Sequence, residues 1–114
     1  CDFFSIGTND LTQYTLAVDR DSELLVGYFN PFSKSVLRLM NIAINSAHKN
    51  NIPVSICGEM ANHPAATPIL VGMGIDEISV SPSILLEIKQ TILNLSYENS
   101  KEYITVMLHF NDLI

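Results

Sequence analysis

The strongest constraint on the fold is that short strand-like runs alternate with longer stretches whose apolar residues recur at helical spacing. The strand-like runs cover residues 3–6, 54–57 and 76–80, and each is followed by a glycine or a serine. Short runs bounded in this way are typical of strands buried in a parallel sheet. The alternation therefore favours an α/β fold in which parallel strands are joined by right-handed crossovers.

The first two helical segments are expected on either side of a loop. Thr8 or Asn9 is expected to cap a short helical turn that extends to Tyr14, and residues 19–33 are rich in loop-forming residues. A longer helix is expected over 34–49, because its apolar residues share one stripe: Val36, Met40, Ala43 and Ala47.

The third helix is expected to begin at Asn62, which acts as its N-cap, with Pro64 in the first turn where proline is tolerated. It should run to about Met73 and stop at Gly74. Pro68 lies close enough to the start to bend this helix mildly at most.

Two further helices are expected at the carboxyl-terminal end. Ser81 followed by Pro82 predicts an N-cap and a first helical residue, and the stripe of this helix comprises Ile84, Ile88, Ile92 and Leu95. A last amphipathic helix is expected over 99–110, with three residues facing inward: Tyr103, Met107 and Phe110.

Composition excludes several classes of protein. A chain of 114 residues with 47% hydrophobic residues is expected to bury one core, and a net charge of −6 argues against a nucleic-acid partner. No apolar run approaches the ~20 residues of a membrane helix, and no signal peptide is visible. Cys1 and Cys57 form no CxxC pattern, which argues against a disulfide framework or a zinc site and weakens a redox or metal-binding cysteine function. A cytoplasmic protein is expected.

Unusual polar residues follow all three predicted strands. Asn9 and Asp10 come after the first strand, Cys57 and Glu59 end or follow the second, and the third carries Ser79 and Ser81. Because ligands bind outside the carboxyl ends of parallel strands, these residues are expected to share one functional rim. Their occurrence at all three strand ends is stronger evidence for a functional site than any one of these residues.

Each of these residues also has an ordinary structural interpretation. Asp10 suits Mg²⁺ as a hard oxygen ligand, yet a carboxylate also suits a helix N-terminus. Asn9 can contact an anion or simply form a turn, and Arg20 can pair with a phosphate or lie on the surface. Cys57 can act as an acid or nucleophile, although a buried cysteine is more often a small hydrophobe. Glu59 can orient water or a ligand, or it can be a helix-entry charge.

Three stretches resemble the phosphoenolpyruvate-utilising enzymes, and among them Enzyme I of the bacterial sugar phosphotransferase system. They are "FFSIGTNDLTQYTLAVDR", "NPFSKSVLRLMNIAINSAHKNNIPVSICGEMA" and "LVGMGIDEISVSPSILLEIK". The likeness extends to about Lys89 and weakens in the last helix. The resemblance implies the last three βα units of a (β/α)₈ TIM barrel plus a C-terminal helix, so that residues 1–114 form the C-terminal part of a phosphoenolpyruvate-binding domain.

The resemblance also implies roles for four residues. Asn9 corresponds to an amide that contacts the substrate phosphate, and Asp10 to one of two carboxylates on Mg²⁺. Arg20 corresponds to a substrate-phosphate arginine, and Cys57 to the acid that protonates the enolate. The implied reaction moves the phosphoryl group of phosphoenolpyruvate to a histidine of the enzyme and then to a phosphocarrier protein in sugar uptake.

Several implied parts are not in this sequence, which is expected to be a piece of a longer protein. The second magnesium carboxylate, the other substrate arginines and the phosphorylated histidine belong upstream in the family. Pyruvate phosphate dikinase or phosphoenolpyruvate synthase remains an alternative parent, and a non-catalytic barrel fragment is an alternative of another class. An opened barrel is expected to self-associate as a homodimer, because inward residues among Phe3, Phe4, Val54, Ile56, Ile78 and Val80 would lose the opposite wall.

Overall fold

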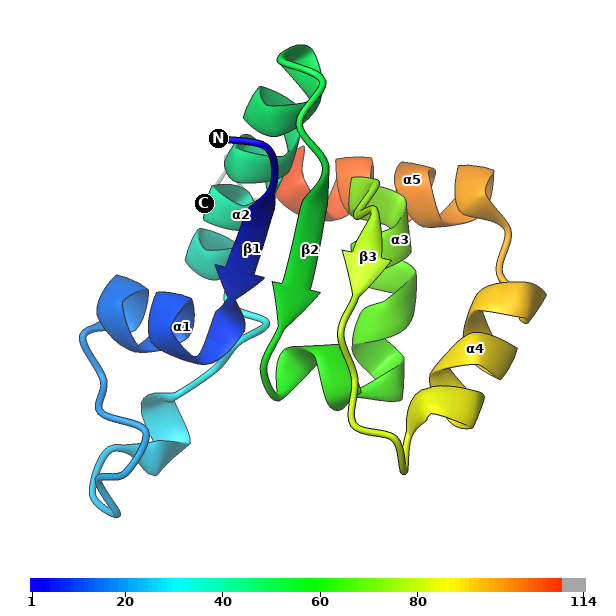
Figure 1. Cartoon of the computed structure of the whole chain (residues 1–114). Coiled ribbons are helices and arrows are strands. Elements are labelled where there is room, and N and C mark those ends of the chain that lie inside the picture. The colour runs from blue at the N-terminus through cyan, green and yellow to red at the C-terminus, as the bar shows by residue number, and fades with distance from the viewer. Residues whose placement is uncertain (110–114) are drawn as a thin grey trace.

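The computed structural model describes residues 1–109 and contains a parallel sheet of three strands. These are β1 (Phe4–Gly7), β2 (Val54–Cys57) and β3 (Glu77–Ile78), arranged in the order β1-β2-β3. Each strand therefore pairs with the next strand along the chain. The segment that connects the two strands of each pair contains helix (Figure 1). The α/β class with parallel strands is confirmed. The third strand is shorter than expected, and the first begins one residue later.

The helices lie behind this sheet and at its sides. They are α1 (Thr8–Leu16), α2 (Lys34–Lys49), α3 (Thr67–Met73), α4 (Leu85–Asn94) and α5 (Tyr97–His109), with short 3₁₀ turns at Val26–Tyr28, Met60–Asn62 and Pro64–Ala66. In Figure 1, α2 and α3 lie behind the sheet, α5 crosses behind them, and α4 stands beside β3. Within residues 1–109, no helix is long and apolar enough to cross a bilayer.

The hydrophobic core lies between the sheet and the helices behind it. The β2 side chains Val54 and Ile56 are fully buried there, against a set of helical residues that includes Leu37, Met40, Ile44, Leu70 and Ile104. Val54 and Ile56 therefore face the helices, and Ile78 and Val80 pack against the same core. None of these four residues faces an open barrel interior, so the expectation that they would is wrong for them. Since side chains alternate along a strand, every second residue must point to the opposite face.

That opposite face is polar. The register aligns Ser5 with Ser55 and Glu77 in one row, and Gly7 with Cys57 in the next. Phe4 shares a face with Val54 by register but is 39% exposed, because β1 is an outer strand. The expectation that the first strand is buried is therefore also wrong for the described chain.

The first two helices form where expected, with one correction at a cap. Helix α2 buries Val36, Met40 and Ala47 of the predicted stripe, and Ala43 is half-buried. The N-cap of α1 is Gly7, and neither Thr8 nor Asn9 caps the helix with its side chain. Both side chains bond instead to Cys57 at the end of β2 and to Glu59 just after it. Each side chain therefore has a partner distant in sequence in place of a backbone group of its own helix.

The predicted helix over 62–73 is replaced by a 3₁₀ turn at Pro64–Ala66 and the short helix α3, and Asn62 is the last residue of the preceding 3₁₀ turn. Asn62 is not an N-cap, because its side-chain oxygen accepts the Ser81 backbone N–H at 2.7 Å. His63 caps the second turn through its Nδ1, which accepts the Ala65 N–H at 3.2 Å. Pro68 lies in the first turn of α3, where a proline removes no helical hydrogen bond. It is therefore not expected to bend the helix.

The last two helices differ from expectation in where they begin and in which side they bury. Helix α4 begins at Leu85 and its N-cap is Ile84, so Ser81 and Pro82 belong to the preceding turn. Ile88 of the predicted stripe is buried, whereas Ile92 is 40% exposed.

In α5 the buried residues are Ser100, Ile104 and Leu108. The inward position predicted for Tyr103 is wrong, because this side chain is 58% exposed. Met107 is half-buried as expected. Phe110 lies outside the described residues.

Candidate functional site

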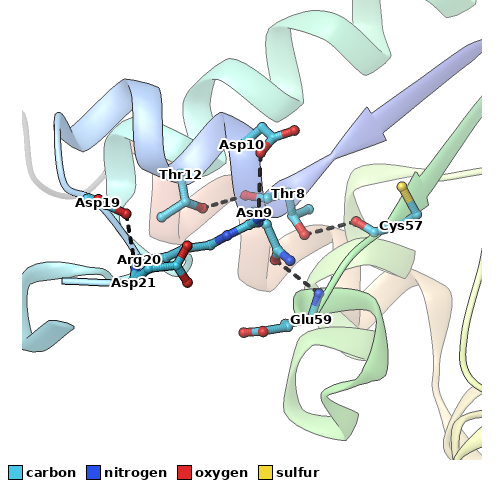
Figure 2. A network of polar contacts seen from close by, with 9 residues as sticks. All are labelled: Thr8, Asn9, Asp10, Thr12, Asp19, Arg20, Asp21, Cys57 and Glu59. Carbon is cyan, nitrogen blue, oxygen red and sulfur yellow. Dashed lines mark hydrogen bonds and ion pairs between the residues drawn. The ribbon is translucent and has the colours of Figure 1, made fainter. Parts of the chain in front are cut away.

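The candidate site is built where β1 and β2 end side by side. Gly7 pairs with Cys57 as the last residue of each strand, and helix α1 begins directly after Gly7. Asn9 and Asp10 therefore lie in the first turn of a helix, next to the segment that follows Cys57. Figure 2 shows these residues together with Arg20 and Glu59.

Asn9 is oriented by a backbone group of the neighbouring strand's end. Its Oδ1 accepts the N–H of Glu59 at 3.1 Å, across 50 residues of sequence. A side-chain amide that accepts through its oxygen keeps both N–H groups of its nitrogen as donors. The bond therefore orients Asn9 as a donor toward an anion, which suits the phosphate contact expected for it.

Asp10 and Arg20 lie together at the exposed edge of the site. Arg20 Nη1 is 3.7 Å from Asp10 Oδ1, and the two side chains are 41% and 73% exposed. An ion pair this long and exposed is weak, so it leaves both groups available to a ligand. The structure thus brings together the residues predicted to bind metal and phosphate.

Cys57 is half-buried, and its contacts come from β1 and the start of α1. Its thiol lies 3.7 Å from the carbonyl oxygen of Ile6, to which it donates, and its own carbonyl accepts the Thr8 hydroxyl at 2.9 Å. Cys1 is exposed, and both cysteines are free. The side chain of Cys57 is therefore held by β1, and its carbonyl by the first residue of α1.

The other polar residues of the predicted rim contribute less. Glu59 offers its backbone N–H to Asn9, while its side chain is exposed. Ser79 donates weakly to Glu77 at 3.5 Å, and the Ser81 N–H is bonded to Asn62. The partners of these serines are thus Glu77 and Asn62, which lie outside the group formed by Asn9, Asp10 and Arg20.

Sequence reasoning missed Thr8 and Gly58. Thr8 was expected at most to cap a helix, yet it is fully buried and bonds to Cys57. Gly58 was expected only to break a strand, yet its φ is +105° and a Cβ there would overlap Thr8 Oγ1. A glycine directly after a strand is a sequence signal that another part of the chain approaches the backbone closely at that position.

The residues present can supply part of a magnesium site. Among residues 1–109, no three His, Cys, Asp or Glu side chains come together as a metal cluster. Asp10 nevertheless offers an exposed carboxylate whose ion pair with Arg20 is long, at 3.7 Å. Mg²⁺ is commonly held by one or two carboxylates together with substrate phosphates and water, so Asp10 fits as one ligand of several.

Comparison with known proteins identifies the family. Residues 1–97 match the phosphoenolpyruvate-binding domain of the PEP-utilising enzymes. The chain belongs to the PEP-utilising enzyme family. This match covers the whole sheet, the candidate rim and helix α4.

Relatives named phosphoenolpyruvate-protein phosphotransferase match most of the chain. The protein from Priestia megaterium is 45% identical over 94% of the chain, and that from Buchnera aphidicola of Acyrthosiphon pisum is 48% identical over 89%. The Bacillus subtilis protein is 44% identical over 90%. The chain spans only 18–19% of the length of these relatives, or about a fifth.

Proposed function

We propose that this chain is the C-terminal part of a phosphoenolpyruvate-binding domain in a PEP–protein phosphotransferase. The observation that carries the proposal is the rim itself. Asn9, Asp10 and Arg20 come together in a chain whose relatives carry that name, and Cys57 stands at the end of the adjacent strand. The relatives' names favour this parent over pyruvate phosphate dikinase or phosphoenolpyruvate synthase.

The proposed fold is the last three βα units of a (β/α)₈ barrel. Its support is that helices cover one face of a parallel sheet, while the other face carries Ser5, Ser55 and Cys57. In such barrels the helices form an outer ring, and the site is built at the carboxyl ends of the strands. The polar face would then line the barrel interior beneath the substrate.

In the proposed reaction, the polar rim residues bind the phosphoryl group of phosphoenolpyruvate and the metal ion. The Asn9 amide and the Arg20 guanidinium bind oxygens of the phosphoryl group, and Asp10 is one ligand of Mg²⁺. When bound, Mg²⁺ supplies positive charge where the phosphoryl and enolate oxygens gain negative charge. The P–O bond breaks as a histidine nitrogen of the enzyme takes the phosphoryl group, which then passes to a carrier protein.

Cys57 completes the proposed reaction by protonating the enolate. The S–H bond breaks, a C–H bond forms at carbon 3, and the enolate becomes the ketone of pyruvate. Sulfur keeps the electron pair as a thiolate, which water reprotonates. Thiols are mostly protonated at neutral pH, so this residue type suits an acid that delivers a proton to carbon.

The test compares Asp10→Asn and Cys57→Ala in the full-length protein. Asp10→Asn should weaken Mn²⁺ binding, measured by calorimetry, and lower PEP-dependent pyruvate formation by about 10²–10³-fold, because a charged ligand is lost. Cys57→Ala should keep Mn²⁺ binding and lower pyruvate formation by about 10²–10⁴-fold, because general acid catalysis is lost.

A matched control is Asp21→Asn, which removes an exposed carboxylate on the nearby loop that receives no role here. It should leave metal binding and pyruvate formation unchanged. Parental rates in both Asp10→Asn and Cys57→Ala would refute the assigned roles.

A further inference from the structure

Two hydrogen bonds clamp the ends of β1 and β2 together around Gly58. On one side of this glycine, the Thr8 hydroxyl donates to the Cys57 carbonyl at 2.9 Å. On the other side, Asn9 Oδ1 accepts the Glu59 N–H at 3.1 Å. Figure 2 shows both bonds leaving consecutive residues of α1 for the two peptide groups that flank Gly58.

The clamp needs a glycine at its centre. Gly58 has a φ of +105°, a conformation that L side chains rarely adopt. A Cβ at this position would overlap Thr8 Oγ1 and come 3.2 Å from Asn9 Oδ1. The backbone therefore turns sharply directly after Cys57, and this turn brings the Cys57 carbonyl to the Thr8 hydroxyl.

A second threonine holds the backbone of Thr8, one of the two residues that form the clamp. Thr12 Oγ1 donates to the Thr8 carbonyl at 2.7 Å, and both threonines are fully buried. Thr8 therefore has no exposed surface with which to contact a substrate. Its hydroxyl proton is directed at the Cys57 carbonyl, so the direct side-chain partner through which Thr8 acts is Cys57.

We propose that Thr8 is a positioning residue that sets the direction of the Cys57 thiol. It holds the Cys57 peptide group from the start of α1, while the thiol itself lies 3.7 Å from the Ile6 carbonyl of β1. The inference rests on the proposed function, in which Cys57 delivers a proton to one carbon of a bound enolate. Proton transfer to carbon requires that donor and carbon be aligned, and a displacement of 1 Å can cost about 10²-fold in rate.

The experiment compares Thr8→Val with Thr8→Ser in the full-length protein, each in a Cys1→Ser background. Valine keeps the shape of threonine and removes the donor, whereas serine keeps the donor and removes a methyl group. Thr8→Val should lower kcat for pyruvate formation by about 10²-fold at an unchanged KM for phosphoenolpyruvate. Thr8→Ser should retain parental kcat, since the hydrogen bond to Cys57 is kept.

A second readout follows the thiol without the reaction. The pH profile of alkylation by iodoacetamide, read by mass spectrometry on the peptide that contains Cys57, reports on this thiol in each variant and its parent. This profile should change in Thr8→Val and be restored in Thr8→Ser. If Thr8→Val does not fold, as judged by circular dichroism, Thr8→Ala replaces it in both measurements with the same expectation.

The outcomes separate this inference from the proposed function. If Cys57→Ala retains parental activity, the acid role itself is wrong, and the positioning role fails with it. If Cys57→Ala is inactive while Thr8→Val keeps parental kcat and alkylation profile, only the positioning role is overturned. Equal losses in Thr8→Val and Thr8→Ser would show a packing effect and would also overturn it.

Discussion

At the scale of single residues, the carboxylate of Asp76 has a structural role, whereas the rim carboxylate of Asp10 is proposed to bind a ligand. It lies at the start of β3, where its Oδ2 accepts the Val54 N–H and contacts His48 Nε2, both at 2.8 Å. The hydrogen bond to His48, followed by that from Val54, lowers the pKa of Asp76 below its ordinary 3.8. This carboxylate joins the end of α2 to the starts of two strands, so its function is structural.

Asp76→Ala should therefore reduce stability in a pH-dependent way. Because the folded-state pKa is lowered, the stabilisation is fully present above pH 3.8 and is lost as pH falls through the folded-state value. The side chain is 44% exposed, so we expect a loss of less than about 1 kcal/mol at neutral pH. Urea unfolding of parent and variant across pH would measure it.

The control for this prediction is Glu102→Gln, which neutralises an exposed carboxylate on α5. Its effect on the free energy of unfolding should be small at every pH. A penalty for Asp76→Ala that grows as the pH is lowered below 3.8 would contradict the linkage argument.

At the scale of elements, the contact between α3 and α5 depends on a small residue. Gly72 is buried in α3, and a Cβ there would overlap the backbone carbonyl of Ser100 in α5. Backbone cannot rotate away as a side chain can, so Gly72→Ala must push the two helices apart. We expect a loss of about 1–3 kcal/mol in the free energy of unfolding, the usual cost of overpacking.

Gly27→Ala is the matched control, because no atom lies within 4 Å of a Cβ built at that loop position. Chemical unfolding followed by circular dichroism would compare the two variants. Equal stability of Gly72→Ala and the parent would show that α5 is free to shift, and that this helix contact is looser than its geometry indicates.

At the scale of the whole molecule, the sheet has open edges and an apolar groove beside one of them. β1 and β3 are the outer strands, and the groove of about 710 Å³ is lined by residues of β3, α3 and α4. Leu85, Ile92 and Leu93 in this groove are 51%, 40% and 75% exposed. Open edges and exposed apolar surface both favour pairing with another chain.

The purified 114-residue chain should therefore self-associate at micromolar concentration. Hiding ~400 Å² of apolar surface is worth roughly 10 kcal/mol before the entropic costs of association. Multi-angle light scattering would measure the oligomer, and Leu93→Glu should shift it toward monomer. Leu24→Glu, at a 90% exposed position outside the groove, should not. A stable monomer of the parent chain would contradict the prediction.

Local patterns in the sequence were enough to predict the order of the elements and the residues at the strand ends. Strand and helix period, together with Gly7, Gly58 and Gly74, marked where elements stop, because these signals act over a few residues. The α2 stripe was predicted correctly for the same reason. Since parallel strands end at a common edge, their positions after two strands are enough to predict that Asn9 and Cys57 share one rim.

Tertiary structure alone decided what each side chain does at its position. Local signals predict a cap at Thr8 or Asn9 and another at Asn62. Asn9 and Asn62 bond instead to Glu59 and Ser81, which lie 50 and 19 residues away. The apolar pattern along β2 also does not determine which face of this strand packs against the helices. A polar side chain bonds to whichever donor or acceptor the fold brings within reach, and an apolar one packs where water is excluded. Both outcomes depend on groups distant in sequence, so local signals do not determine them.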